Sequence, residues 1–250
     1  MKQLLAIGLI AIGGATLGLA GTREERLEAL EYAVVDPDCD GSGTDEVAGD
    51  VYVRQMYEMT ADEMVQDLIA LSLKYGVDET NAAHRAARQF AVGRLAYYQA
   101  TNQLEYLTAI WRNPQDYAKK EALLAAMGLC KSGDGLFDIA NEVVTNAVAF
   151  PATVRSAVYQ RLYSYYSRGS ETDVPQIQKD RIAAYFLSRV DLEREPIYAF
   201  LDGKVCEMFP SYRHSQRRRD NLAAVYDPTL TGAPKEVYEA RVRDAQPVEE

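Results

Sequence analysis

Histidine, tryptophan and cysteine are scarce in this chain of 250 residues, which has two histidines, one tryptophan and three cysteines. Neither His84 nor His214 has a second histidine one helical turn away, so the sequence lacks the pattern of a histidine-rich zinc site. No cysteine pair has metal or redox spacing, no Gly-Xaa-Ser-Xaa-Gly elbow follows a strand, and no glycine-rich loop ends in Lys-Ser or Lys-Thr. The sequence therefore predicts a protein that is not an enzyme, because the common catalytic patterns are missing.

Basic residues are fewer than acidic ones. The chain has 27 lysines and arginines against 37 aspartates and glutamates, which gives a formal net charge of -10. Twelve of the acidic residues lie between positions 22 and 62, where there are three arginines. Binding to nucleic-acid phosphates needs a basic surface, so we expect no nucleic-acid partner.

Long uncharged segments are absent except at the N-terminus, where Lys2 precedes an uncharged run over 4–20. The run ends in small residues and is at the lower length limit for crossing a bilayer, which is typical of a secretory signal peptide. We expect residues 1–20 to be that signal peptide and the mature protein to be exported, either periplasmic or secreted. The alternative is an uncleaved N-terminal anchor. No later segment is apolar enough to cross a membrane, so we expect no stable membrane insertion after cleavage.

The three cysteines are Cys39, Cys130 and Cys206, and an odd number in an exported chain leaves at least one thiol free or intermolecular. Cys130 and Cys206 lie in helical, apolar surroundings. Two interpretations stay open for this pair: a disulfide between them, or two free thiols that act as small buried hydrophobes. The roughly 230 residues left after cleavage are enough to form a core without disulfides.

Helical periodicity is found along almost the whole chain. Met64, Leu68, Leu71 and Tyr75 fall at i, i+4, i+7 and i+11, which places them on one face of a helix that ends before Gly76. Breaks at glycine and proline separate the other helices. The predicted helices cover residues 23–35, 61–75, 81–101, 102–112, 115–131, 135–149, 151–168, 174–190, 192–209, 212–226 and 234–245.

These helices predict an all-α protein. We expect a single helical domain over 61–245, preceded by an acidic arm over 21–60 with an aspartate-rich loop, and followed by a disordered tail over 246–250. Short helices joined by short connections pack as antiparallel hairpins, which stack as an α-solenoid or gather in a bundle.

Three segments share a pattern of charged residues followed by small and aliphatic ones. They are Lys-Lys-Glu-Ala-Leu-Leu-Ala-Ala-Met at 119–127, Thr-Val-Arg-Ser-Ala-Val-Tyr-Gln-Arg-Leu-Tyr at 153–163 and Arg-Arg-Asp-Asn-Leu-Ala-Ala-Val at 218–225. Over roughly 115–226 the chain resembles HEAT-like α-solenoid repeat proteins. The resemblance implies a concave surface that binds a protein or peptide, without an active site. An irregular helical bundle is the alternative, because two of the candidate helices begin only about 23 residues apart, short of a HEAT period.

One segment has a pattern associated with metal binding. Asp36, Asp38 and Asp40 alternate before Gly41, as in the first half of an EF-hand calcium loop, and Asp45 follows. The position that needs a bidentate glutamate is instead Val47. Two interpretations therefore stay open: a solvated acidic loop with no cofactor, or a non-standard calcium site with Asp36, Asp38, Asp40 and Asp45 as ligands.

Tyrosine is abundant, with seventeen tyrosines against six phenylalanines. Tyr159, Tyr163 and Tyr166 fall at i, i+4 and i+7 on one predicted helix. Tyrosine offers a large contact area and a hydroxyl group, which suits a binding groove. The same stripe can also be a half-buried packing face with its hydroxyls at the rim.

A short basic cluster includes Arg213, Arg217 and Arg218. It could hold an anion, or it could be a solvated face that is paired with nearby acids.

These observations favour an exported, non-enzymatic helical binding or scaffold protein whose partner is a protein or peptide. The alternatives are a structural or assembly protein of the cell envelope and an enzyme of unrecognised type. For the enzyme, acid pairs such as Glu58 with Asp62 or Glu193 with Glu195 could in principle form a glycosidase dyad. The sequence leaves the ligand and the oligomeric state open.

Overall fold

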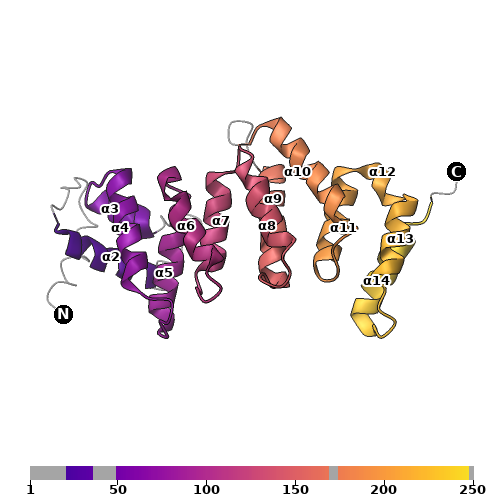
Figure 1. Cartoon of the computed structure of the whole chain (residues 1–250), viewed down its shortest axis with the longest axis horizontal. Helices are drawn as coiled ribbons and strands as arrows, with labels where there is room; N and C mark the ends of the chain where they lie inside the picture. Colours follow the sequence, from indigo (N-terminus) through magenta and orange to yellow (C-terminus); the bar gives the residue numbers. More distant parts are fainter. Residues whose placement is uncertain (1–20, 36–48, 169–173, 248–250) are drawn as a thin grey trace, which may run out of the picture. The chain divides into compact units, whose positions relative to one another are not determined.

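The computed structural model describes residues 21–35, 49–168 and 174–247. Over these residues the chain forms thirteen α-helices, one short 3-10 helix and no strand, which confirms the predicted all-α class (Figure 1). The predicted signal peptide at 1–20 lies outside the described residues. Among the helices of the described part, none combines the length and the apolar character needed to cross a membrane.

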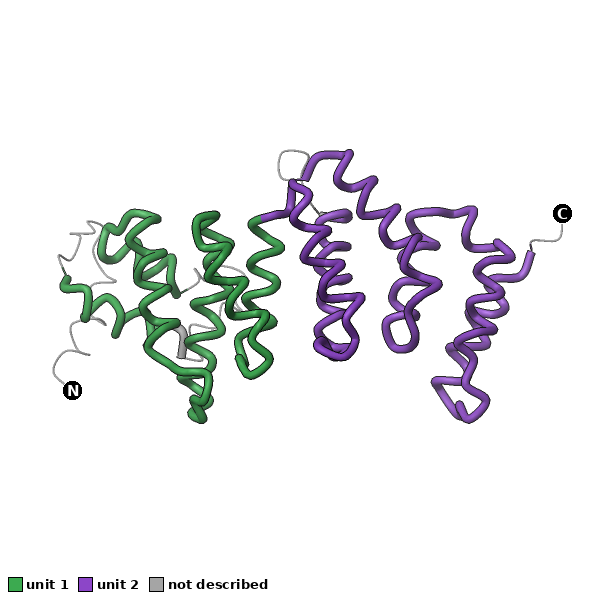
Figure 2. The backbone as a smooth tube through the Cα atoms, in the orientation of Figure 1, with its two compact units in different colours: residues 1–129 green, residues 130–250 purple. Residues whose placement is uncertain are grey.

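The chain divides into two compact units, Met1–Leu129 and Cys130–Glu250 (Figure 2). The predicted single domain over 61–245 includes parts of both units and stays a prediction. The elements described in unit 1 are α2 (Arg23–Val35), α3 (Gly49–Met56), α4 (Ala61–Lys74), α5 (Ala82–Arg94), η2 (Thr101–Gln103), α6 (Leu104–Arg112) and α7 (Lys119–Leu129).

The core of unit 1 is built on the predicted apolar stripe of α4. Met64, Leu68 and Leu71 are buried on the face that packs against α5 and α2. The helix begins with a capping box: the Thr60 hydroxyl accepts the backbone N–H of Glu63 at 3.2 Å, and the Glu63 carboxylate accepts the backbone N–H of Thr60 at 2.8 Å. The segment before residue 61 also contributes to this core through α2 and α3, which pack on each other and on α4.

Two turns in unit 1 place a residue other than glycine at positive φ. Glu58 after α3 and Gln99 after α5 both have a φ of 51°. At each turn the residue after the left-handed one donates its N–H to a carbonyl five positions back: Met59 to Arg54 at 2.9 Å, and Ala100 to Leu95 at 3.2 Å. This is the Schellman arrangement that usually takes glycine. The predicted helix 81–101 is shorter in the structure, because α5 ends at Arg94 and the turn at Gln99 closes the segment that follows it.

Unit 2 contains the remaining described helices. They are α8 (Gly135–Val144), α9 (Ala152–Arg168), α10 (Gln176–Arg189), α11 (Ile197–Met208), α12 (Pro210–Arg213), α13 (Gln216–Ala224) and α14 (Gly232–Asp244). The predicted helix 212–226 is interrupted, because the Ser215 hydroxyl accepts the backbone N–H of Arg218 at 3.2 Å and caps a new helix. The predicted helix 192–209 starts later, at Ile197.

Helices two places apart in the chain make polar contacts within each unit. In unit 1, Arg94 of α5 donates to Asp50 of α3 at 2.9 Å. In unit 2, Tyr185 of α10 donates to Asn141 of α8 at 2.9 Å. Alternate helices therefore lie side by side locally, as stacked hairpins require. The HEAT-like solenoid itself stays a prediction.

Candidate binding groove

Each buried carboxylate of the described residues is paired with an arginine. The shortest nitrogen–oxygen distances are 2.5–2.9 Å, for Asp50 with Arg94, Asp67 with Arg26, Asp116 with Arg88, Glu193 with Arg155, and Asp202 with Arg218. A buried charge is tolerated when an opposite charge and hydrogen bonds compensate its loss of hydration. The buried acids are therefore accounted for as structural ion pairs.

The predicted tyrosine stripe is divided between the core and the surface. Tyr159 is fully buried and its hydroxyl donates to Glu193 at 2.8 Å, so it does not line an exposed groove. Burial raises the pKa of Tyr159 well above its usual range, which keeps the hydroxyl protonated. The Tyr163 hydroxyl contacts Glu207 of α11, and the Tyr163 ring stacks against Tyr166 with ring centres 6.2 Å apart. A binding role for Tyr163 and Tyr166 stays a prediction.

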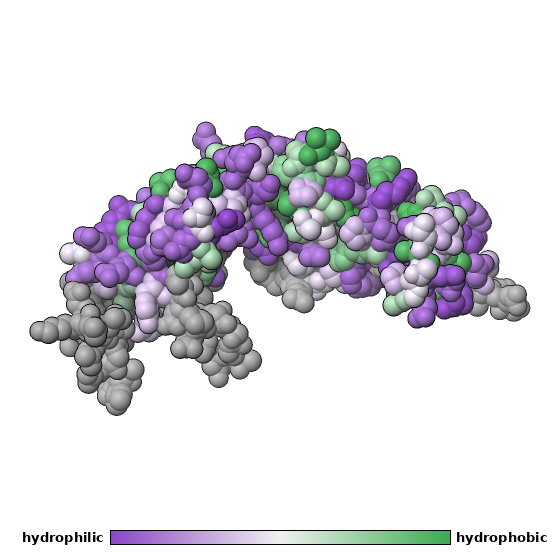
Figure 3. Space-filling view, turned by 90° about the horizontal axis from the view of Figure 1, so that it is seen from below, coloured by the Kyte–Doolittle hydropathy of each residue, from purple (hydrophilic) through white to green (hydrophobic). Residues whose placement is uncertain are grey.

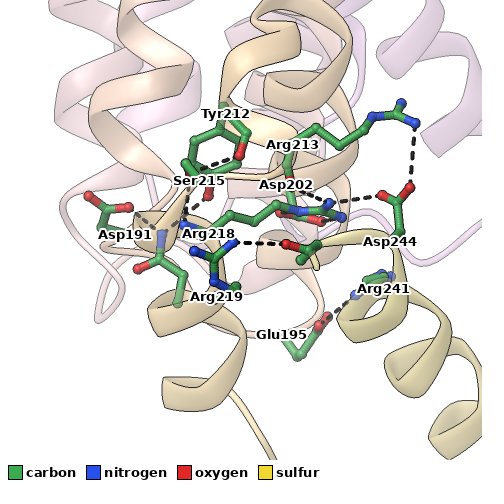
Figure 4. A network of polar contacts seen from close by, with 12 residues as sticks. Asp191, Glu195, Asp202, Tyr212, Arg213, Ser215, Arg218, Arg219, Arg241 and Asp244 are labelled. Carbon is green, nitrogen blue, oxygen red and sulfur yellow. Dashed lines mark hydrogen bonds and ion pairs between the residues drawn. The ribbon is translucent and has the colours of Figure 1, made fainter. Parts of the chain in front are cut away.

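The predicted basic cluster is part of a polar network that joins α11, α13 and α14 (Figure 4). Arg218 forms two parallel bonds to Asp202 of α11, at 2.9 and 3.0 Å. It also donates to Asp244 of α14 at 2.8 Å. Its side chain is only 3% exposed. Arg218 therefore attaches the last helix of the unit through a buried charge, and the bidentate geometry fixes its orientation.

The other two arginines of the cluster are paired at the surface. Arg217 donates to Asp191 at 2.8 Å and to the carbonyl of Leu187 at 2.7 Å. Arg213 lies 3.5 Å from Asp244. The interpretation that nearby acids pair with this cluster is confirmed, although Arg218 is buried rather than solvated.

A groove with a volume of about 500 Å³ is formed by α14, by the connection that joins α13 to α14, and by Glu195 just before α11. Most of its lining is apolar. Figure 3 shows pale and green atoms exposed among the hydrophilic ones at the end of unit 2 that carries these helices, at the right of the view. The lining residues are Glu195, Val225, Asp227, Leu230, Ala233, Pro234, Val237, Tyr238 and Arg241.

The walls of the groove are fixed by local hydrogen bonds. One carboxylate oxygen of Asp227 accepts both the backbone N–H of Thr229, at 2.9 Å, and its hydroxyl, at 2.7 Å. These bonds form an Asx-turn and hold the pKa of Asp227 below its usual range. Tyr238 donates to the carbonyl of Leu222 at 2.9 Å, and its ring centre is 4.9 Å from that of Tyr226.

Helix α14 exposes its apolar side chains on this groove. None of its residues is buried, and Val237 is 52% exposed. In its last turn, Arg241 pairs with Glu195 at 3.1 Å across the groove. The helix is therefore held by ion pairs and one tyrosine hydrogen bond rather than by a buried apolar face, which leaves that face available.

The groove was not predicted, although its helix was. The signals present in the sequence were the Asp-Pro-Thr turn at 227–229 and the apolar pair Val237 and Tyr238.

The two acids suggested as a glycosidase dyad, Glu193 and Glu195, have different partners. Glu193 pairs with Arg155, and Glu195 pairs with Arg241.

The predicted calcium ligands Asp36, Asp38, Asp40 and Asp45 lie outside the described residues, so calcium stays a prediction. Among the described residues no group of three or more histidines, cysteines or acids could hold a metal ion. Cys130 and Cys206 are both free thiols, which favours the interpretation without a disulfide. Burial raises the pKa of the Cys206 thiol to about 11.

Comparisons with protein-family models, curated proteins and solved structures gave no match to this chain.

Proposed function

We propose that this chain is an exported, non-enzymatic helical protein that binds a segment of a partner protein in the groove formed by α14 and the connection before it. The observation that carries the proposal is an open apolar groove on a helix that has no buried residue. Exposed apolar surface that is held in a defined shape is typical of interaction sites. The signal-peptide pattern over 1–20 supports export.

The shape of the groove favours a peptide segment over a small molecule. Pockets for small ligands enclose most of the ligand surface. Here Val237 and the neighbouring Tyr226 are 52% and 47% exposed, so a small ligand would remain largely in water. A partner helix laid along a groove can instead cover both residues with successive turns.

The two alternative functions have weaker support. A structural or assembly role would need a self-complementary surface and would give a dimer that depends on concentration. An enzyme would need a reactive group. Each buried acid of the described residues is already paired with an arginine, and burial leaves the Cys206 thiol largely protonated near neutral pH.

A selection from a displayed library of short random peptides tests the proposal. The mature protein is used as bait, and bound clones are compared with those retained by the Val237→Glu variant. The control is Val148→Glu, because Val148 is a fully exposed valine of the same unit outside the groove. We expect clones that bind the wild type and the control but not the groove variant. A selection that yields no clone sensitive to Val237→Glu would refute this function.

A further inference from the structure

The charged side chains that line the groove have a net negative charge. Three charged side chains line it: Glu195, Asp227 and Arg241. Glu195 and Arg241 pair with each other at 3.1 Å, so their charges largely cancel. Asp227 has no ion-pair partner among the described residues. The groove therefore presents one uncompensated negative charge beside its apolar lining.

Asp227 is available to a ligand. Only its Oδ1 atom accepts the two hydrogen bonds from Thr229, and Oδ2 accepts none from the described residues. A carboxylate can accept about four hydrogen bonds. The pKa of Asp227 is lowered, so the group is charged near neutral pH. The Asx-turn also holds the carboxylate in place, which reduces the entropy that a ligand would otherwise have to offset.

An exposed aromatic ring adjoins this carboxylate in the sequence. Tyr226 precedes Asp227, and its ring packs at a tilt against Tyr238 and remains 47% exposed. The face of a tyrosine ring attracts cations, and a carboxylate attracts them more strongly. Lysine and arginine are the side chains that a carboxylate and a tyrosine ring both attract.

We infer that the groove selects partner segments in which a basic residue accompanies the apolar residues that fill it. This inference rests on the proposed function and specifies its partner: an amphipathic segment with at least one lysine or arginine directed at Asp227.

The test uses three fluorescein-labelled peptides of about four helical turns with leucines at i, i+3, i+4 and i+7. They are identical except for one residue beside the leucines, which is lysine, glutamine or glutamate. Fluorescence anisotropy measures the Kd of each for the full mature protein. We expect the lysine peptide to bind about threefold to fivefold more tightly than the glutamine peptide, as a partly exposed ion pair gives.

Two variants assign this preference to the groove. Asp227→Asn keeps the acceptor for Thr229 and removes the charge, so the lysine and glutamine peptides should then bind equally. Asp138→Asn, an exposed position on α8, makes the same charge change elsewhere in the unit and should keep the preference. Thermal melts of both variants check that they fold.

The outcomes separate the two proposals. If all three peptides bind equally and Val237→Glu abolishes the binding, the groove function stands and the selectivity for basic residues is wrong. Should no peptide bind, or should Val237→Glu leave the Kd unchanged, the groove function is overturned and the selectivity with it. A dimer in sedimentation velocity that Val237→Glu dissociates would show that a second copy occupies the groove, which also overturns the inference.

Discussion

Replacing Arg218 should destabilise unit 2 more than any surface change near it. Arg218→Met keeps the length and the helical preference of the side chain, but it leaves the Asp202 carboxylate without its charge partner. That carboxylate is only 2% exposed, so water cannot replace the arginine. Removing one partner of a buried ion pair costs about 3–5 kcal/mol, because the remaining charge is neither hydrated nor paired.

Two further variants make this reasoning quantitative. Asp244→Asn removes only the outer contact of Arg218, and because Asp244 is 42% exposed the loss should be at most about 1 kcal/mol. Arg218→Met combined with Asp202→Leu removes both charges. It should recover most of the loss, since an apolar pair of similar volume often replaces a buried ion pair without penalty.

Urea unfolding followed by circular dichroism gives these free energies. Trp111, the only tryptophan, belongs to unit 1, so its fluorescence is not a probe of this change. Hydrogen exchange supplies a local measurement, and amides of α13 and α14 should lose protection first in Arg218→Met. The reasoning fails if Arg218→Met costs no more than Asp244→Asn, or if the double variant is less stable than Arg218→Met alone.

Three smaller effects are also expected. Glu58→Gly and Gln99→Gly should each raise stability by about 1 kcal/mol in urea unfolding, because glycine adopts their positive φ without strain, whereas alanine at either site should give no gain. Cys206 should react with iodoacetamide about a hundredfold more slowly at pH 8 than in the urea-unfolded chain, as peptide mass spectrometry can measure, since its pKa of about 11 is two units above the ordinary 9.0; equal rates would contradict its burial. The pKa of Asp227 is lowered in the folded state, so its turn stabilises the protein above the ordinary value of 3.8 and loses this effect as the pH falls below it. The difference in melting temperature between wild type and Asp227→Asn should therefore shrink in acid, and a difference that grows would contradict the assignment.

The helices were predictable because they follow local periodicity. The helical spacing of Met64, Leu68 and Leu71 predicts an α-helix with one buried face, and all three side chains are buried in the structure. Boundaries were harder to predict. Helix α5 ends at Arg94, and the predicted helix cannot continue through Gln99, which takes a left-handed conformation that usually belongs to glycine. Helix α13 starts at a serine cap inside an otherwise continuous pattern.

The roles of the polar residues could not be predicted, because they depend on partners far away in the sequence. Arg217 and Arg218 are neighbours in one basic run, yet one lies at the surface and the other is buried against Asp202. Tyr159 and Tyr163 share a helical stripe, but Glu193 holds the first inside the core. The groove also depends on partners that are distant in the sequence. Ion pairs hold α14 in position, while its apolar side chains stay uncovered.

In helix α14, the residue that bonds to Arg218 and the apolar residues that line the groove lie at opposite ends. Asp244 near its end makes the bond to Arg218, while Ala233, Pro234 and Val237 near its start line the groove. Substitutions at the start of the helix can change what the groove accepts without loosening that attachment. The helix is thus a natural position for partner choice to diverge between related chains, and a suitable place to graft a new specificity by design.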